Sequence, residues 1–95
     1  MKQFISDIAD ALSMLGSLQK DLSINDFKPN ELKVFYTIIG SENQTGEPCN
    51  ISDVVTNSGM SRSTVYKTLK KLVAINIIQL EQSVLDKREF LIKLN

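Results

Sequence analysis

The 95-residue sequence contains no histidine, a single cysteine (Cys49) and no long apolar run. It also lacks a glycine-rich phosphate loop, a nucleophile-elbow pattern and any carboxylate cluster with metal-ligand spacing. These are the residue patterns that hydrolases, phosphotransferases and metalloenzymes need for their chemistry. The sequence therefore argues against an enzyme, and against a bound metal or organic cofactor.

A lone cysteine cannot form an intramolecular disulfide, which favours a reducing, cytoplasmic location. A redox sensor needs an exposed thiol of low pKa, so a small buried thiol is the simpler interpretation of Cys49. Asp7 and Asp10 interrupt the apolar N-terminus, and no stretch approaches the roughly 20 apolar residues of a membrane span. We therefore expect a soluble cytoplasmic protein without membrane contact.

The net charge of zero conceals a difference between the two parts of the chain. Residues 1–59 carry eight acidic and four basic side chains, whereas residues 60–95 carry three acidic and seven basic ones. A chain of this length forms one domain, residues 1–95, with one core. Its C-terminal part is the one suited to a polyanion.

Apolar residues at helical spacing predict an amphipathic helix within residues 1–24. They are Met1, Phe4, Ile8, Ala11, Leu15, Leu18 and Leu22, with Ile5 and Leu12 beside them. Two interpretations remain open for this heptad-like stripe: it packs on the core of its own domain, or it pairs with another chain.

Residues 29–76 are predicted to form a helical core. Pro29 suits the first turn of a helix, although Lys28 is a poor cap, and the apolar spacing runs to Gly40. The polar segment "SENQTGEPC" is expected to be a loop that leads to a short extended piece at 49–51.

Two short helices joined by a glycine turn, a helix-turn-helix, are predicted within residues 52–73. Ser52 and Ser61 are the expected caps, and Gly59 is the expected left-handed residue between the helices. In the second helix, Val65, Leu69, Leu72 and Val73 share the inward arc, and Ser63, Lys67, Lys70 and Lys71 share the outward one. In the first, Val54 and Val55 are expected to point inward.

Residues 77–95 are predicted to form a β-hairpin, because "NIIQLEQ" and "REFLIKL" are β-prone runs with "SVLDK" between them. Asn76 tolerates the left-handed conformation that ends the preceding helix. The expected fold class is α+β, mainly α: a winged helix-turn-helix with an N-terminal amphipathic helix and a C-terminal two-stranded β wing.

Residues 61–72 hold four basic side chains and no acidic one, which favours contact with double-stranded DNA over a merely solvated face. We expect Ser63, Thr64 and Lys67 to reach base edges. The residues expected at the sugar-phosphate backbone are Ser61, through its helix terminus, and Arg62, Tyr66, Lys70 and Lys71.

At the wing tip, two interpretations remain open. Lys87 and Arg88 could reach a minor groove with Asp86 orienting Arg88, or could belong to an ordinary polar turn.

From Phe27 to Asn95 the chain resembles the MarR-type winged helix-turn-helix regulators. The resemblance is carried by "FKPNELKVFYTI", "ISDVVTNSGMSRSTVYKTLKKLVAINII" and "LDKREFLIKLN". The Ser-x-x-Thr-Val start of the recognition helix and the Asp-x-Arg wing match at Ser61, Thr64, Val65, Asp86 and Arg88. Lys28 and Asn76 stand where the family usually has threonine and glycine.

The resemblance implies a dimeric repressor on a near-palindromic DNA site, located with the nucleoid. It also implies that Ser63, Thr64 and Lys67 face the major groove and that Arg88 lies on a minor-groove wing. Typical members continue past the wing into two long dimerisation helices, which this sequence does not contain, so ligand sensing is not expected. The expected dimer contacts are instead in the N-terminal stripe, at Phe4, Ile8, Leu15, Leu18 and Leu22, with Val73, Ala74 and Ile75 extending the apolar patch.

Two other functions remain open. Small winged helices also resemble the partition adaptors of plasmids and phages, which bind centromere-like repeats and recruit a motor protein as partner. A winged helix used only for protein–protein contact is the third interpretation, although such domains tend to lose the basic face that this chain keeps.

Overall fold

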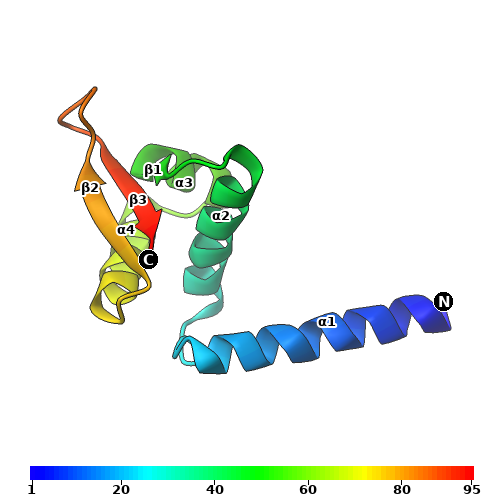
Figure 1. The fold of residues 1–95 in the computed structure, drawn as a ribbon. Coiled ribbons are helices and arrows are strands. Elements are labelled where there is room, and N and C mark those ends of the chain that lie inside the picture. Colours follow the sequence, from blue (N-terminus) through cyan, green and yellow to red (C-terminus); the bar gives the residue numbers. More distant parts are fainter.

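The structure is a computed structural model that describes residues 1–95. Three helices and a small sheet form a body, and a long first helix extends away from it (Figure 1). In chain order the elements are α1 (Lys2–Asp21), α2 (Pro29–Thr45), β1 (Cys49–Asn50), α3 (Ile51–Ser58), α4 (Arg62–Ala74), β2 (Ile78–Gln82) and β3 (Phe90–Leu94).

Helix α2 begins at the expected place but is longer than the sequence indicated. The Glu31 carboxylate accepts a hydrogen bond from the backbone N–H of Lys28 at 2.9 Å, so Glu31 supplies the cap that the Lys28 side chain cannot. The helix does not end at Gly40; it continues to Thr45 and ends at Gly46, whose φ is 73°. A single glycine within a helix costs only about 1 kcal/mol, which packing of the helix on the core outweighs.

The predicted helix-turn-helix is present as α3 and α4. Helix α3 starts two residues earlier than expected, because Asn50 rather than Ser52 caps it by accepting from the N–H of Asp53 at 2.8 Å. Gly59 ends α3 with φ 70°, and Ser61 caps α4 by accepting from the N–H of Thr64 at 3.2 Å. Both were predicted from the sequence.

The predicted two-stranded wing is present, and a third strand joins its sheet. Strands β2 and β3 form the predicted antiparallel hairpin after Asn76, whose φ is 64°. The extended residues Cys49 and Asn50 also pair with Ile92 and Leu91, so the strand order is β1-β3-β2. The sequence indicated the extended piece but not its long-range partner.

The hydrophobic core lies between α2, α3, α4 and the inner face of the sheet. It consists of Ile24, Val34, Phe35, Ile38, Cys49, Ile51, Val54, Val65, Leu69, Leu72, Ile78 and Ile92. Val73, expected to point inward, is 44% exposed, because it lies about 80° around the helix from Val65 and Leu72 takes the core position. Val55 is half-buried, packed at the margin of the core.

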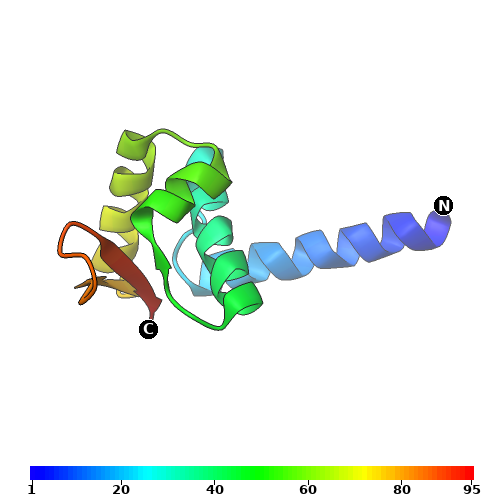
Figure 2. The same cartoon turned by 90° about the horizontal axis from the view of Figure 1, so that it is seen from above.

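Helix α1 does not pack on the core of its own domain, so that interpretation of its apolar stripe is wrong for this chain. None of its residues is buried, and it projects from the body along most of its length (Figures 1 and 2). It is tied to the body near its end, where the Gln19 side chain donates a hydrogen bond to the Tyr36 hydroxyl. No helix of the structure is both long enough and apolar enough to cross a bilayer.

Candidate nucleic-acid interface

Helix α4 has a buried side and an exposed basic side, as the sequence predicted. Val65, Thr68, Leu69 and Leu72 are buried against the core. The exposed residues are Ser61, Arg62, Ser63, Tyr66, Lys67 and Lys70. The part of α4 up to Lys70 therefore holds hydroxyl, aromatic and cationic groups on one accessible face.

The first turn of α4 is ordered by its own hydroxyl groups. The Ser61 hydroxyl lies 2.9 Å from that of Thr64 and 3.1 Å from that of Ser63. The Thr64 side chain is half-buried, and its backbone carbonyl accepts from the Thr68 hydroxyl at 2.8 Å. Among the three residues predicted to reach base edges, Ser63 and Lys67 are thus freely exposed and Thr64 is partly engaged.

The start of α4 and the base of the wing are neighbours. Arg62 and Tyr66 line the same shallow hollow as Arg88, Glu89 and Phe90. Long contacts connect them through Ser52 of α3, whose hydroxyl lies 3.5 Å from an Arg62 guanidinium nitrogen and 3.4 Å from a Glu89 carboxylate oxygen. The tertiary structure thus joins the two segments that the sequence assigned separately to DNA contact.

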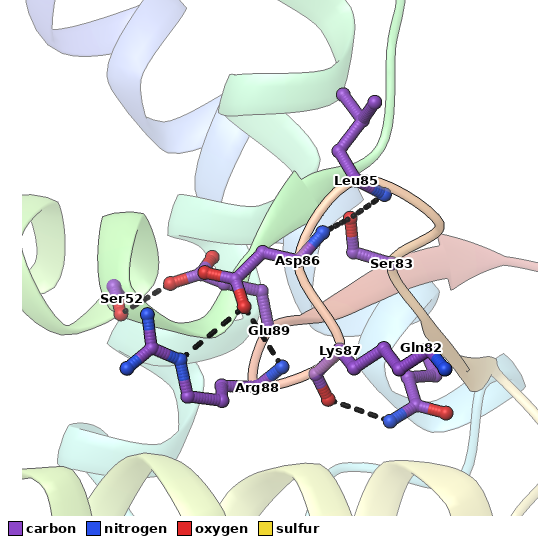
Figure 3. Close-up of polar contacts among 8 residues, drawn as sticks. All are labelled: Ser52, Gln82, Ser83, Leu85, Asp86, Lys87, Arg88 and Glu89. Carbon is purple, nitrogen blue, oxygen red and sulfur yellow. Dashed lines mark hydrogen bonds and ion pairs between the residues drawn. The ribbon is translucent and has the colours of Figure 1, made fainter.

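Asp86 contacts Arg88 in the wing loop, the pairing that one of the two interpretations of this turn expected. Asp86 Oδ1 accepts from the backbone N–H of Arg88 at 3.0 Å and lies 3.4 Å from its Nε (Figure 3). The loop is braced further by Gln82 Nε2, which donates to the Lys87 carbonyl at 2.6 Å. The Arg88 side chain is nevertheless 92% exposed, so it is oriented at its base and free at its end.

Lys71 lies apart from the other basic residues of α4. Its ammonium group lies 2.7 Å from Oε2 and 3.0 Å from Oε1 of Glu31, and 5.4 Å from the centre of the Phe27 ring. Burial alone would raise the pKa of Glu31, but the hydrogen bonds from Lys71 and from the Lys28 backbone, with the charges of Lys71 and Lys67, hold it below its ordinary value. Glu31 is therefore an ionised carboxylate in a largely buried site.

Two polar residues that the sequence analysis did not assign to DNA contact, Lys28 and Asn30, adjoin the exposed face of α4. Lys28 and Asn30, at the start of α2, line one hollow together with Thr64 and Lys67, and Pro29 and Glu31 complete its lining. Lys28 is exposed and adds a cation beside Lys67. The sequence showed that a helix starts at Lys28-Pro29. Only the fold shows that this helix start lies next to α4.

The remaining chemistry-bearing residues form no second site. Cys49 is 6% exposed, and burial raises the pKa of its thiol despite a hydrogen bond with Ser41. This environment is the opposite of the one that a redox-sensing thiolate requires. No group of three or more cysteine, aspartate or glutamate side chains is placed to hold a metal ion.

The family model described as "Sugar-specific transcriptional regulator TrmB" matches residues 22–90, which include the helix-turn-helix and most of the wing. The chain belongs to the TrmB family. The members that this model describes are transcriptional regulators, and the helix-turn-helix and most of the wing of this TrmB-family chain lie within the matched residues. A comparison with curated proteins finds no significant match.

Solved structures of MarR-type regulators share the fold of this TrmB-family chain, which confirms the resemblance seen in the sequence. A mutant MarR from E. coli is 19% identical with a TM-score of 0.61, covering 100% of this chain and 65% of MarR. PcaV from Streptomyces coelicolor is 15% identical with a TM-score of 0.61, covering 95% and 63%. Reduced AbfR, solved bound to DNA, is 19% identical with a TM-score of 0.59, covering 100% and 69%. The chain thus spans slightly less than two thirds of the length of MarR and PcaV.

The residues predicted for dimerisation lie on the projecting helix of the TrmB-family chain. Phe4, Ile8, Leu18 and Leu22 are 63%, 43%, 50% and 41% exposed, and Leu15 is half-buried. Val73 and Ile75, proposed to extend this patch, are also exposed but sit on α4 and its C-cap. The N-terminal part of the stripe, at Phe4 and Ile8, has no covering partner within its own chain. Its C-terminal part, at Leu15, Leu18 and Leu22, lines a hollow with residues of α2.

Proposed function

We propose that this chain is a dimeric repressor that binds double-stranded DNA sequence-specifically, with α4 in the major groove. The observation that carries the proposal is the exposed face of α4, where Arg62, Lys67 and Lys70 are free of acidic partners and lie beside a wing with an oriented arginine. A groove of B-DNA admits one helix of this width, and cations on its flanks neutralise phosphates.

The exposed side chains are assigned to two groups, according to whether they contact base edges or the sugar-phosphate backbone. Ser63 and Lys67, with the half-buried Thr64, are assigned to base edges, because recognition helices of this kind read bases from their N-terminal turns. Ser61, Arg62, Tyr66 and Lys70 are assigned to the sugar-phosphate backbone, and Lys28 joins them because it lines the same hollow as Lys67. Lys71 is assigned to positioning α4, because Glu31 holds its ammonium group.

The wing is assigned to the adjacent minor groove. Asp86 orients the base of Arg88 while leaving its guanidinium exposed, and Lys87 is exposed beside it. Arginine is favoured in narrow A·T-rich minor grooves, where the negative potential is enhanced. This contact would add preference for the flanking sequence without requiring a further recognition helix.

A dimer through α1 supplies the second recognition helix. One module of this size buries too little surface to select a site tightly, and twofold pairing doubles the contacts. Eight of the sixteen exposed large hydrophobic side chains lie within residues 1–22, and such a concentration is typical of an interface. Repression would follow from steric occlusion of the promoter.

The test is selection of duplexes from a random pool by the 95-residue chain, followed by sequencing and by sedimentation of the complex. The proposal expects one inverted repeat occupied by one dimer. Ser63→Glu/Lys67→Glu should lose the selection, whereas the matched variant Lys20→Glu on α1 should keep it. Retention of tandem direct repeats by several dimers would favour a partition adaptor, and no retention of any duplex would contradict DNA binding.

A further inference from the structure

The junction between α1 and α2 contains an apolar groove. A hollow of about 190 Å³ lies between the C-terminal half of α1, at Leu18 and Leu22, and the middle of α2, at Phe35 and Ile39. Gln19 is the one lining residue that is neither aliphatic nor aromatic, and its side chain is engaged with Tyr36. A cavity of about 150 Å³ holds a benzene ring, so the groove has room for a large apolar side chain.

The other end of α1 carries large apolar side chains with nothing against them. Phe4 is 63% exposed, Ile5 is 60% exposed and Ile8 is 43% exposed. All three lie on the half of α1 that projects furthest from the body (Figures 1 and 2). The C-terminal end of α1 thus borders an empty apolar groove, and its N-terminal end carries exposed apolar side chains.

The spacing of the stripe makes these two ends complementary. In an antiparallel pair of α1 helices centred on residue 13, Phe4 of one copy faces Leu22 of the other, Ile8 faces Leu18 and Ala11 faces Leu15. We infer that the N-terminal half of α1 from a second copy packs antiparallel into the groove between α1 and α2. This inference rests on the dimer proposed above. Phe4 and Ile5 of the second copy then enter beside Ile39.

A parallel pair would not fill the groove. It would place Phe4 against Phe4 and Leu22 against Leu22, leaving each groove facing the other. It would also bring both bodies to the same end of the helix pair, since each body lies at the C-terminal end of its α1 (Figure 1). The antiparallel pair places the two bodies at opposite ends.

The antiparallel arrangement has one electrostatic consequence. Asp7 and Asp21 lie on the same flank of the stripe, three residues from Phe4 and from Leu18 respectively. Antiparallel pairing brings Asp7 of one copy beside Asp21 of the other, and this like-charge pair opposes association. Asp7→Lys should therefore strengthen the dimer, and the gain should shrink as salt is added.

The deciding experiment measures the distance between spin labels on Lys2→Cys in a Cys49→Ser background. An antiparallel pair places the two labelled positions about 33 Å apart along the axis. A parallel pair places them about 10 Å apart, the spacing of packed helices. A short distance in a dimer that still selects an inverted repeat would overturn this inference alone, whereas a monomer at all concentrations would overturn the proposed dimer as well.

A second measurement tests the groove itself. Ile39→Asp changes α2 and leaves the stripe of α1 intact, and it should weaken dimerisation at least tenfold in sedimentation equilibrium. Leu80→Asp is the matched control, because Leu80 is similarly exposed at 40% against 39% for Ile39 but lies on β2. Equal dimer affinity for both variants would show that the groove is not occupied.

Discussion

The ammonium group of Lys71 lies 2.7 Å from Oε2 of Glu31 and thereby joins α4 to the first turn of α2. The same carboxylate accepts from the backbone of Lys28, so one buried group both caps α2 and anchors α4. The contact spans 40 residues of sequence. It sets how the proposed recognition helix sits on the helix behind it.

Replacing Lys71 should destabilise the fold because it leaves a buried carboxylate without its cation. We expect Lys71→Met to lower the free energy of unfolding by about 1–3 kcal/mol, moderated because the lysine side chain is 39% exposed. Lys70→Met, at an exposed position, should change it by less than about 0.5 kcal/mol. Urea denaturation of both variants measures the difference, and equal stabilities would refute the anchoring role.

Stability should depend on pH through Glu31. Its pKa in the folded state is below the ordinary value of 4.5, so the folded protein binds fewer protons at this site than the unfolded chain. The stabilisation is therefore complete above about pH 4.5 and is lost as the pH falls through the lowered pKa. Thermal melting between pH 7 and pH 3 should show a steeper decline for the natural chain than for Glu31→Gln; parallel curves would contradict this origin.

Lys67 and Lys70 should differ in the kind of DNA binding that they support. Lys67→Ala should weaken binding to a selected site more than binding to random duplex, because Lys67 is assigned to base edges. Lys70→Ala should weaken both and lower the slope of log K against log salt by about one, the loss expected for one phosphate contact. Titrations by fluorescence anisotropy at several salt concentrations distinguish the two, and identical behaviour would count against the assignment.

Arg88 should report the minor groove through the sequence that flanks the site. Arg88→Ala should weaken binding most on A·T-rich flanks and reduce the preference for them over G·C-rich flanks. Asp86→Ala should have a smaller effect in the same direction, since it removes the carboxylate that orients the arginine but leaves the guanidinium group. Competition between duplexes that differ only in their flanks measures both effects. A uniform loss on all flanks would indicate a simple phosphate contact.

Local pattern was enough to locate most elements. The helix-turn-helix was visible because Gly59 and Ser61 have strong conformational preferences of their own, and the hairpin was visible from β-prone runs around a polar turn. The errors lay where distant residues contribute: α2 continues past Gly40, where Ser41 and Glu42 are half-buried, and β1 exists because Cys49 and Asn50 pair with β3. Neither feature can be recognised from a short stretch of the sequence, because both depend on residues far away in the chain.

The candidate interface divides in the same way. The sequence alone determines that α4 is amphipathic and that its outer face is basic. It also places Asp86 two residues before Arg88. These properties are local, because they depend on the helix period and on turn chemistry. Three features became visible only in the tertiary structure. Lys71 is paired with Glu31, Lys28 lines the same hollow as Lys67, and α1 has no buried residue. Those outcomes depend on which surfaces bury one another, a matter of packing between segments that lie far apart in the chain.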